Sequence, residues 1–175
     1  RLIVYSENGF WHLYDAHSCA YVRQLSGPAG DAEPQWHPTN PDLLYYFPTN
    51  GMGMQIRQLN VETNTNSVVT DLTTRLRAIW PTAAAAWTKS EGSPSKDARY
   101  WCLMVETSSF ASLGLVCYDM QADAIVGSMN TPGNRPDHVS MSASGTYCVP
   151  SWDSANGTRA YTRDFSSFTQ LHHKS

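Results

Sequence analysis

The strongest constraint on the fold is a pattern that recurs four times along the 175-residue chain. Each copy has an alternating strand, a turn that begins at Asp or Asn, and a second strand. The turn residues stand 45, 59 and 45 residues apart, at Asp15, Asn60, Asp119 and Asp164. Asp and Asn suit this position because their side chains accept hydrogen bonds from the backbone two residues further on. Self-similarity at this period predicts repeated units of one supersecondary type.

A second shared element lies upstream of the last three copies. It is a tight turn that leads into an aromatic-rich strand, and it occurs at Ser95–Tyr100, at Ser142–Tyr147, and at Trp36–Asp42 before Leu43–Phe47. A shift of 103 residues places Trp36 on Val139 and His37 on Ser140. On this alignment, we expect His37 to have a structural hydrogen-bonding role within the repeat.

Together these elements make a unit of four antiparallel strands, a to d, with one turn between a and b and the Asp or Asn turn between c and d. Four-stranded units of this length are typical of β-propeller blades, so the sequence predicts an all-β fold. The expected blades cover approximately residues 1–27, 31–72, 78–129 and 136–173. Because the first lacks its strand a, the chain has about 3.75 four-stranded blades.

The third unit leaves one alternative open. Its strand a is expected at Ala83–Trp87, but a short helix through TAAAAW competes because Ala favours helix. The repeat pattern favours the strand. An extra loop at Lys89–Pro94 accounts for the 59-residue interval.

An arc of fewer than four blades leaves two blade faces and their edges uncovered. We therefore expect the chain to be part of a larger propeller, or a partial ring completed by self-association with another copy or by another chain.

The charge and the apolar runs argue against two classes of partner. The net charge is −3 and the Lys and Arg residues are scattered, so nucleic-acid binding is not expected. No apolar run approaches the roughly 18 residues of a membrane span, so membrane insertion is not expected.

The four cysteines have no metal-ligand spacing, and no metal site is predicted from them. Three lie in apolar strand-like runs, which favours buried thiols. Cys102 is expected opposite Tyr118, which argues against a bridge to Cys117. The compartment stays open, with a periplasmic or secreted location favoured.

The segments W-H-P-x-x-P-D-L-L-Y, from Trp36, and S-x-S-G-x-Y, from Ser142, resemble TolB-type propeller repeats. Repeats of this type also build the seven-bladed oligogalacturonide and polysaccharide lyases. WD repeats match less well, because their Gly-His and Trp-Asp dipeptides are missing from the repeat positions. The resembled lyases use histidines with a metal, but this chain has no His-x-His or comparable spaced set. A divalent metal is therefore expected only if the chain is a lyase.

In propellers, the d–a and b–c loops gather on one face around the central channel, where ligand pockets form. These loops supply eight ligand-binding candidates: Glu33, Asn50, Arg75, Arg77, Arg135, His138, Asp153 and Asn156. Arginine suits a carboxylate because its planar guanidinium binds both oxygens. His138 and Arg135 are the candidates for catalysis, and simple solvation is the alternative for every residue of the set.

These observations predict a binding or assembly module, or a catalytically incomplete propeller segment, with a carbohydrate or protein ligand at the loop-lined mouth. The alternative is a polysaccharide lyase that cleaves an acidic oligosaccharide by β-elimination.

Overall fold

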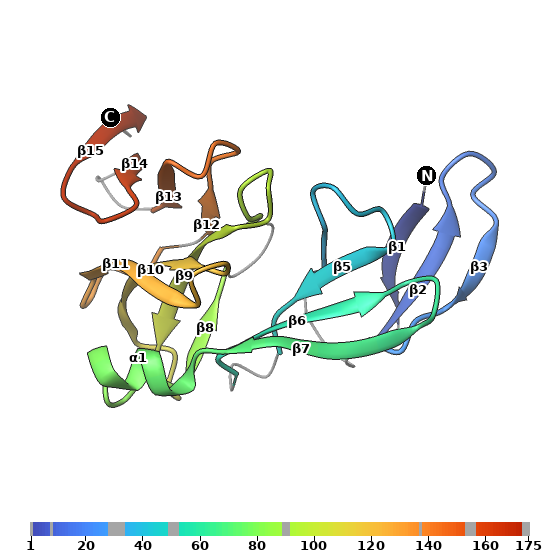
Figure 1. Ribbon diagram of the computed structural model, residues 1–175, viewed down its shortest axis with the longest axis horizontal. Helices are drawn as coiled ribbons and strands as arrows, with labels where there is room; N and C mark the ends of the chain where they lie inside the picture. Colours follow the sequence, from blue (N-terminus) through green and yellow to red (C-terminus); the bar gives the residue numbers. More distant parts are fainter. Residues whose placement is uncertain are drawn as a thin grey trace.

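The computed structural model describes residues 2–7, 9–27, 34–48, 53–88, 92–136, 138–152 and 157–172. Within them, 15 strands and one helix form four antiparallel sheets that follow one another in chain order. Figure 1 shows these sheets as an open arc, with the two termini at opposite ends. The predicted all-β architecture of four antiparallel blades is confirmed.

Each sheet is one blade, and its strands pair in sequence order. The first blade contains β1 (Leu2–Glu7), β2 (Phe10–Asp15) and β3 (Tyr21–Gln24). The second contains β4 (Gln35–Trp36), β5 (Leu43–Tyr46), β6 (Gln55–Asn60) and β7 (Thr65–Asp71). The third contains β8 (Ala85–Trp87), β9 (Tyr100–Glu106), β10 (Ser112–Asp119) and β11 (Ala124–Asn130). The fourth contains β12 (His138–Met141), β13 (Tyr147–Ser151), β14 (Thr158–Thr162) and β15 (Phe168–His172). Within the described residues, no helix is long and apolar enough to cross a membrane.

The c–d turns have the predicted geometry in the first three blades. In each, the side-chain Oδ1 of Asp15, Asn60 or Asp119 accepts the backbone N–H groups two and three residues later, at 2.8 to 3.1 Å. The residue four positions on then has a positive φ of 52° to 56°. The fourth turn differs: Asp164 accepts the N–H of Ser166 at 3.1 Å, and the positive φ falls on Phe165.

The a–b turns correct the sequence alignment. The His37 N–H donates to the Leu43 carbonyl as the Ser142 N–H donates to that of Tyr147, at 2.9 and 2.8 Å. His37 therefore corresponds to Ser142 rather than to Ser140, and the 103-residue shift is wrong by two positions here. The second blade has one more residue in its turn, which the ungapped shift does not allow for.

The predicted structural role of His37 is confirmed. Its Nδ1 accepts the N–H groups of Thr39 and Asn40 at 3.2 and 3.1 Å, and its ring stacks on Tyr45 with 5.1 Å between centroids. The Ser142 Oγ accepts the Tyr147 N–H at 2.9 Å in the matching turn. Partial burial lowers the pKa of His37, which favours the neutral, accepting imidazole.

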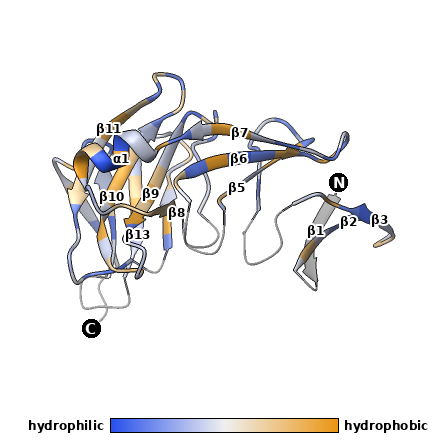
Figure 2. Ribbon diagram, turned by 90° about the horizontal axis from the view of Figure 1, so that it is seen from below, coloured by the Kyte–Doolittle hydropathy of each residue, from blue (hydrophilic) through white to orange (hydrophobic). Residues whose placement is uncertain are grey.

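Three hydrophobic clusters fill the three interfaces between consecutive blades. On β9, Trp101, Leu103 and Val105 pack toward the second blade, whereas Cys102 and Met104 pack toward the fourth. This alternation follows from the period of two along a strand, and burial on both sides explains the continuous apolar run. In Figure 2, much of the hydrophobic colour lies on the strands of the third blade.

Between the second and third blades, α1 (Thr73–Ile79) occupies a region that the sequence analysis treated as a loop. Leu72 precedes the helix and Leu76 lies one turn later; both are fully buried in the cluster between these blades. A seven-residue helix with one buried position leaves too little periodicity to be recognised from sequence. At Ala85–Trp87, by contrast, the predicted strand is present and the competing helix is not.

A disulfide joins Cys102 on β9 to Cys148 on β13, with 5.3 Å between the Cα atoms. The expectation of buried free thiols is therefore wrong for this pair. The predicted register is also wrong, because Cys102 lies opposite Cys117 rather than Tyr118. An irregularity between Ser112 and Gly114 shifts the β9–β10 pairing by one residue. Cys117 remains a buried thiol, and burial raises its pKa to about 12.

We predict that Cys148→Ser lowers the free energy of unfolding by about 4 kcal/mol, because the disulfide closes a loop between residues 46 positions apart. Urea unfolding followed by tryptophan fluorescence measures this change. Cys19→Ser is the matched control, because the Cys19 thiol is exposed and unpaired. Thiol titration of the unfolded, unreduced chain should find two free thiols, and a count of four would contradict the linkage.

Candidate functional site

The described chain contains four of the eight predicted site residues. Glu33, Asn50, Asp153 and Asn156 lie outside the described residues. Arg75, Arg77, Arg135 and His138 lie within them. His138 begins β12, is exposed, and stands opposite Ser151 of β13.

Arg75 is held by contacts with the protein itself. Its Nε donates to the Asp123 carbonyl at 3.0 Å, and its guanidinium pairs with the Asp123 carboxylate in the c–d turn of the third blade. At the other end of α1, the Trp80 indole N–H donates to Asn130 Oδ1 at 2.8 Å, where β11 ends. The helix thus packs along the third blade, and Arg75 reaches the end of that blade opposite the b–c loops. Its Nη1 also donates to the Asp71 carbonyl at 3.1 Å. These contacts account for Arg75 structurally, and its role in ligand binding stays a prediction.

Arg135 forms part of a buried network at the end of β9. Its Nε donates to Glu106 Oε1, and the Trp87 indole N–H donates to Glu106 Oε2 at 2.8 Å. The Glu106 side chain is fully buried, whereas that of Arg135 remains 38% exposed. Since a buried carboxylate needs such partners, the ion pair accounts for Arg135 structurally.

The loop that carries Arg135 is anchored at several points. The Thr131 N–H donates to the Leu113 carbonyl at 3.1 Å, and the Thr131 and Ser112 hydroxyls are 2.8 Å apart. The Trp152 indole N–H donates to the Asn134 carbonyl at 3.3 Å. Sequence analysis missed Glu106, because a single acid at the end of an apolar strand does not reveal which distant arginine pairs with it.

Arg77 lines a second polar site, on the predicted mouth face. A cavity of about 350 Å³ lies beside the b–c hairpin of the second blade and the start of α1. It is lined by Pro48, Gly53, Met54, Gln55, Arg57, Asp71, Thr73, Arg77 and Ala84. The Arg77 Nε donates to the Ala83 carbonyl at 3.2 Å, which fixes the side chain at the cavity wall.

The charges in this cavity are unequally satisfied. Asp71 accepts the Gln55 side-chain amide and the Thr73 N–H, both at 2.9 Å. Hydrogen bonds from the Thr73 and Gln55 side chains lower the pKa of Asp71, so it is ionised at neutral pH. The Arg57 Nε is buried and has no hydrogen-bond partner in the described structure, an exception it shares only with Trp11 Nε1. Two guanidinium groups and one carboxylate line this cavity, and the excess positive charge suits an anionic ligand.

The described residues contain no group of three or more His, Cys, Asp or Glu side chains that could hold a metal ion.

No protein-family model matches this sequence, and a search of curated proteins gave no match. Among solved structures, TolB from Acinetobacter baumannii is similar, with a TM-score of 0.65 and 17% identity over 94% of this chain and 38% of that chain. The dihydro-heme d1 dehydrogenase NirN, in complex with DHE, is similar with a TM-score of 0.54 and 13% identity over 99% of this chain and 34% of that chain.

At these identities, the likeness shows the fold alone. It confirms that the chain has a TolB-like propeller fold, which the Trp36 and Ser142 segments predicted. Neither of the two structures is a polysaccharide lyase. The chain spans less than two-fifths of the length of each of them.

We predict that Arg135→Gln lowers the free energy of unfolding by about 2 kcal/mol, because it leaves the charge of Glu106 buried with the Trp87 indole as its one remaining side-chain partner in the described structure. In the double variant Glu106→Gln/Arg135→Gln, the loss should be smaller than the sum of the two single losses, since the unpaired charge is then removed. Chemical denaturation of all four proteins measures the coupling. Strictly additive losses would contradict a direct ion pair.

Proposed function

We propose that this chain is a propeller module that binds an acidic carbohydrate through the cavity lined by Arg57 and Arg77. The observation that supports this proposal most directly is that two guanidinium groups, those of Arg57 and Arg77, line one cavity together with a single carboxylate, that of Asp71. One positive charge is thus left over in the cavity, and a ligand carboxylate pairs with it through charge-assisted hydrogen bonds.

The rest of the cavity fits the same ligand class. Arg77 keeps its terminal nitrogens for a carboxylate, since its described backbone contact uses only Nε. Asp71 is held in place by Gln55 and Thr73 and accepts a sugar hydroxyl. A uronic acid combines a carboxylate with neighbouring hydroxyls, so it matches both features. The ligand class is therefore a uronate-containing oligosaccharide.

We expect trigalacturonate to bind the intact chain, and a neutral trisaccharide such as maltotriose to bind at least about tenfold more weakly, because one charge-assisted contact accounts for that factor. Isothermal titration calorimetry measures both affinities. Arg77→Gln should weaken trigalacturonate binding by a similar factor. Arg23→Gln is the control, because Arg23 lies in the first blade, away from the cavity.

Equal affinity for the acidic and neutral sugars would contradict the proposal, as would unchanged binding by Arg77→Gln. The same mixtures, incubated with and without a divalent metal, also test the lyase alternative. A rise in ultraviolet absorbance from unsaturated uronate would show β-elimination. The chain would then be a lyase rather than a module that only binds the sugar.

A second proposed role, in assembly, is favoured by the outward face of the first blade. Trp11 and Leu13 pack toward the second blade, so Phe10, His12 and Tyr14 point to the other side of β2. Tyr21 joins them, with ring centroids 5.7 Å from Tyr14 and 5.9 Å from His12. Phe10 is 43% exposed and Tyr21 is 56% exposed. We propose that this aromatic face is covered by the fourth blade of a second copy.

The fourth blade offers a matching uncovered surface. Cys148 and Tyr161 pack toward the third blade, which places Tyr147 on the outward side of β13. Tyr147 and Leu171 are exposed large side chains of this blade. Two copies placed head to tail cover the first-blade and fourth-blade faces of both, as each internal blade is covered by its neighbours.

We expect light scattering after size-exclusion chromatography to give about twice the monomer mass of 19.5 kDa. Tyr21→Lys places a charge on the proposed interface and should shift the mass toward the monomer. Arg23→Lys, a conservative change on the same strand, is the control. A wild-type chain that stays folded and monomeric at high concentration would contradict assembly through this face.

A further inference from the structure

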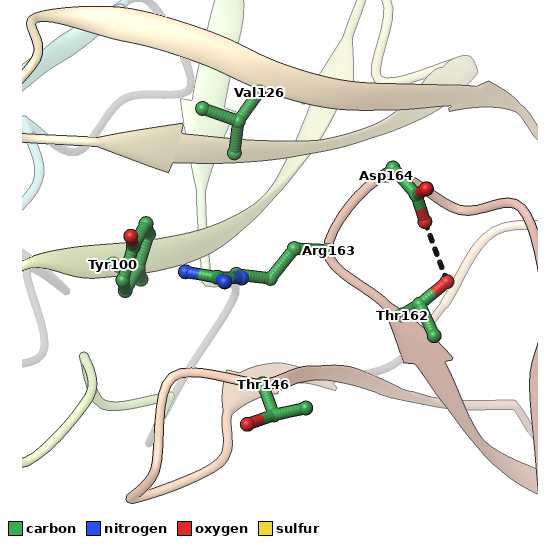
Figure 3. Close-up of a pocket in the computed structure, with 6 residues that line it drawn as sticks. All are labelled: Tyr100, Val126, Thr146, Thr162, Arg163 and Asp164. Carbon is green, nitrogen blue, oxygen red and sulfur yellow. Dashed lines mark hydrogen bonds between the residues drawn. The ribbon is translucent and has the colours of Figure 1, made fainter.

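A second hollow lies between the third and fourth blades, at the end where the a–b and c–d turns lie. Its volume is about 420 Å³, within the range of small-molecule sites. It is lined by Tyr100, Val126, Thr146, Thr162, Arg163 and Asp164, which Figure 3 shows in close-up. We infer that this hollow binds a small monocarboxylate that has a short apolar group.

The cationic group of this site is Arg163. Figure 3 shows its side chain extending from the c–d turn of the fourth blade toward Tyr100. Its guanidinium carbon lies 4.1 Å from the centroid of the Tyr100 ring. Such a cation–π contact restrains the position of the guanidinium beside the ring.

A second arginine beside the same ring, Arg99, differs from Arg163 in having a carboxylate partner. It also contacts the Tyr100 ring, at 4.8 Å, but it binds both carboxylate oxygens of Asp119 at 2.7 to 3.1 Å. In the part of the chain that the structure describes, Arg163 has neither a carboxylate within salt-bridge distance nor a hydrogen-bond acceptor. Its donors are therefore available to a ligand in the hollow, and a carboxylate is the group that they fit best.

Two glycines allow the walls of the hollow to approach one another. A Cβ at Gly127 of β11 would lie 2.6 Å from the Asp164 Cα, and one at Gly145 would lie 2.7 Å from Tyr100 Cδ2. Gly145 also has a φ of 70°, which favours glycine. The turns therefore hold Arg163 and Tyr100 at fixed positions before any ligand binds, which reduces the entropy lost on binding.

The remaining wall residues limit the kind of anion. Val126 is 39% exposed and supplies an apolar contact, and Figure 3 places it across the guanidinium from Thr146. The Asp164 carboxylate accepts the Thr162 hydroxyl at 2.6 Å, and this bond, with those from Ser166, lowers the pKa of Asp164 to about 2. One fixed negative charge beside one positive charge disfavours a dianion such as phosphate. In a monocarboxylate with a short alkyl group, the carboxylate pairs with Arg163 and the alkyl group packs against Val126.

Butanoate is the probe for this site, and NMR titration of the intact, isotope-labelled chain is the measurement. We expect saturable shifts of the Tyr100 and Val126 resonances. Arg163→Gln should weaken binding by about tenfold to a hundredfold, the loss of one charge-assisted contact. Arg163→Lys should bind with intermediate affinity, because it keeps the charge but loses the planar, bidentate group.

Two controls separate this site from the cavity of the second blade. Arg77→Gln should leave butanoate binding unchanged, and Arg163→Gln should leave trigalacturonate binding unchanged. Butan-1-ol tests whether the negative charge of the ligand is needed, and inorganic phosphate tests whether a more highly charged anion also binds. The inference is overturned if butanoate gives no saturable shift, if butan-1-ol or phosphate binds as well, or if Arg163→Gln binds as the wild type does.

Discussion

The structure depends on the burial of both faces of its inner blades. A lone four-stranded sheet has two faces to cover, and here each internal sheet is covered by the blade before it and the blade after it. The alternation on β9 makes this possible, since Trp101 and Leu103 serve one interface while Cys102 and Met104 serve the other. Trp101 meets Tyr45 and Phe47 edge to face, each with 5.3 Å between centroids. Most of the remaining features fix how one blade meets the next.

Hydrogen bonds fix how each blade is aligned with the next, because the apolar packing of the clusters is not directional. The Ser26 N–H donates to Asn64 Oδ1 at 2.7 Å between the first and second blades. The Ala86 N–H donates to the Gly53 carbonyl at 3.0 Å between the second and third. The Met141 N–H donates to the Ser93 carbonyl at 3.1 Å between the third and fourth. The candidate cavities follow from this arrangement, because each lies at or beside a boundary where loops or turns of neighbouring blades converge.

Sequence analysis was accurate for the first three c–d turns, where the signal is local. The Asp15, Asn60 and Asp119 turns are recognisable because the residue that accepts the hydrogen bonds and the backbone that donates them are adjacent in sequence. It failed where the partner comes from another blade. The pairing of Cys102 with Cys148 depends on how two sheets stack, and strand periodicity within either sheet contains no information about it.

The candidate sites show the same division. The position of Arg135 on a d–a loop was predictable, because the order of strands in a blade decides which loops share a face, whereas Arg77 lies in the unexpected helix α1. The partner of Arg135 was not predictable, since Glu106 is 29 residues away and ends an otherwise apolar strand. Arg163 was missed because it lies in a c–d turn, on the end of the blade that the propeller analogy assigns to structure. Only the structure shows that the Arg163 guanidinium, unlike that of Arg99, has no carboxylate partner among the described residues.

The disulfide has a consequence for how the arc comes apart. In an array of blades that contact only their neighbours, one blade separates from the next when the interface between them is lost. The link between β9 and β13 holds the last blade to the third even when its packing is broken. The neighbouring Cys117 is a poor candidate to exchange into this link, because a thiol with a pKa of about 12 is almost never a thiolate. Among the described blades, the fourth is thus harder to separate from its neighbour than the first, which has no covalent link to the second blade in the described structure.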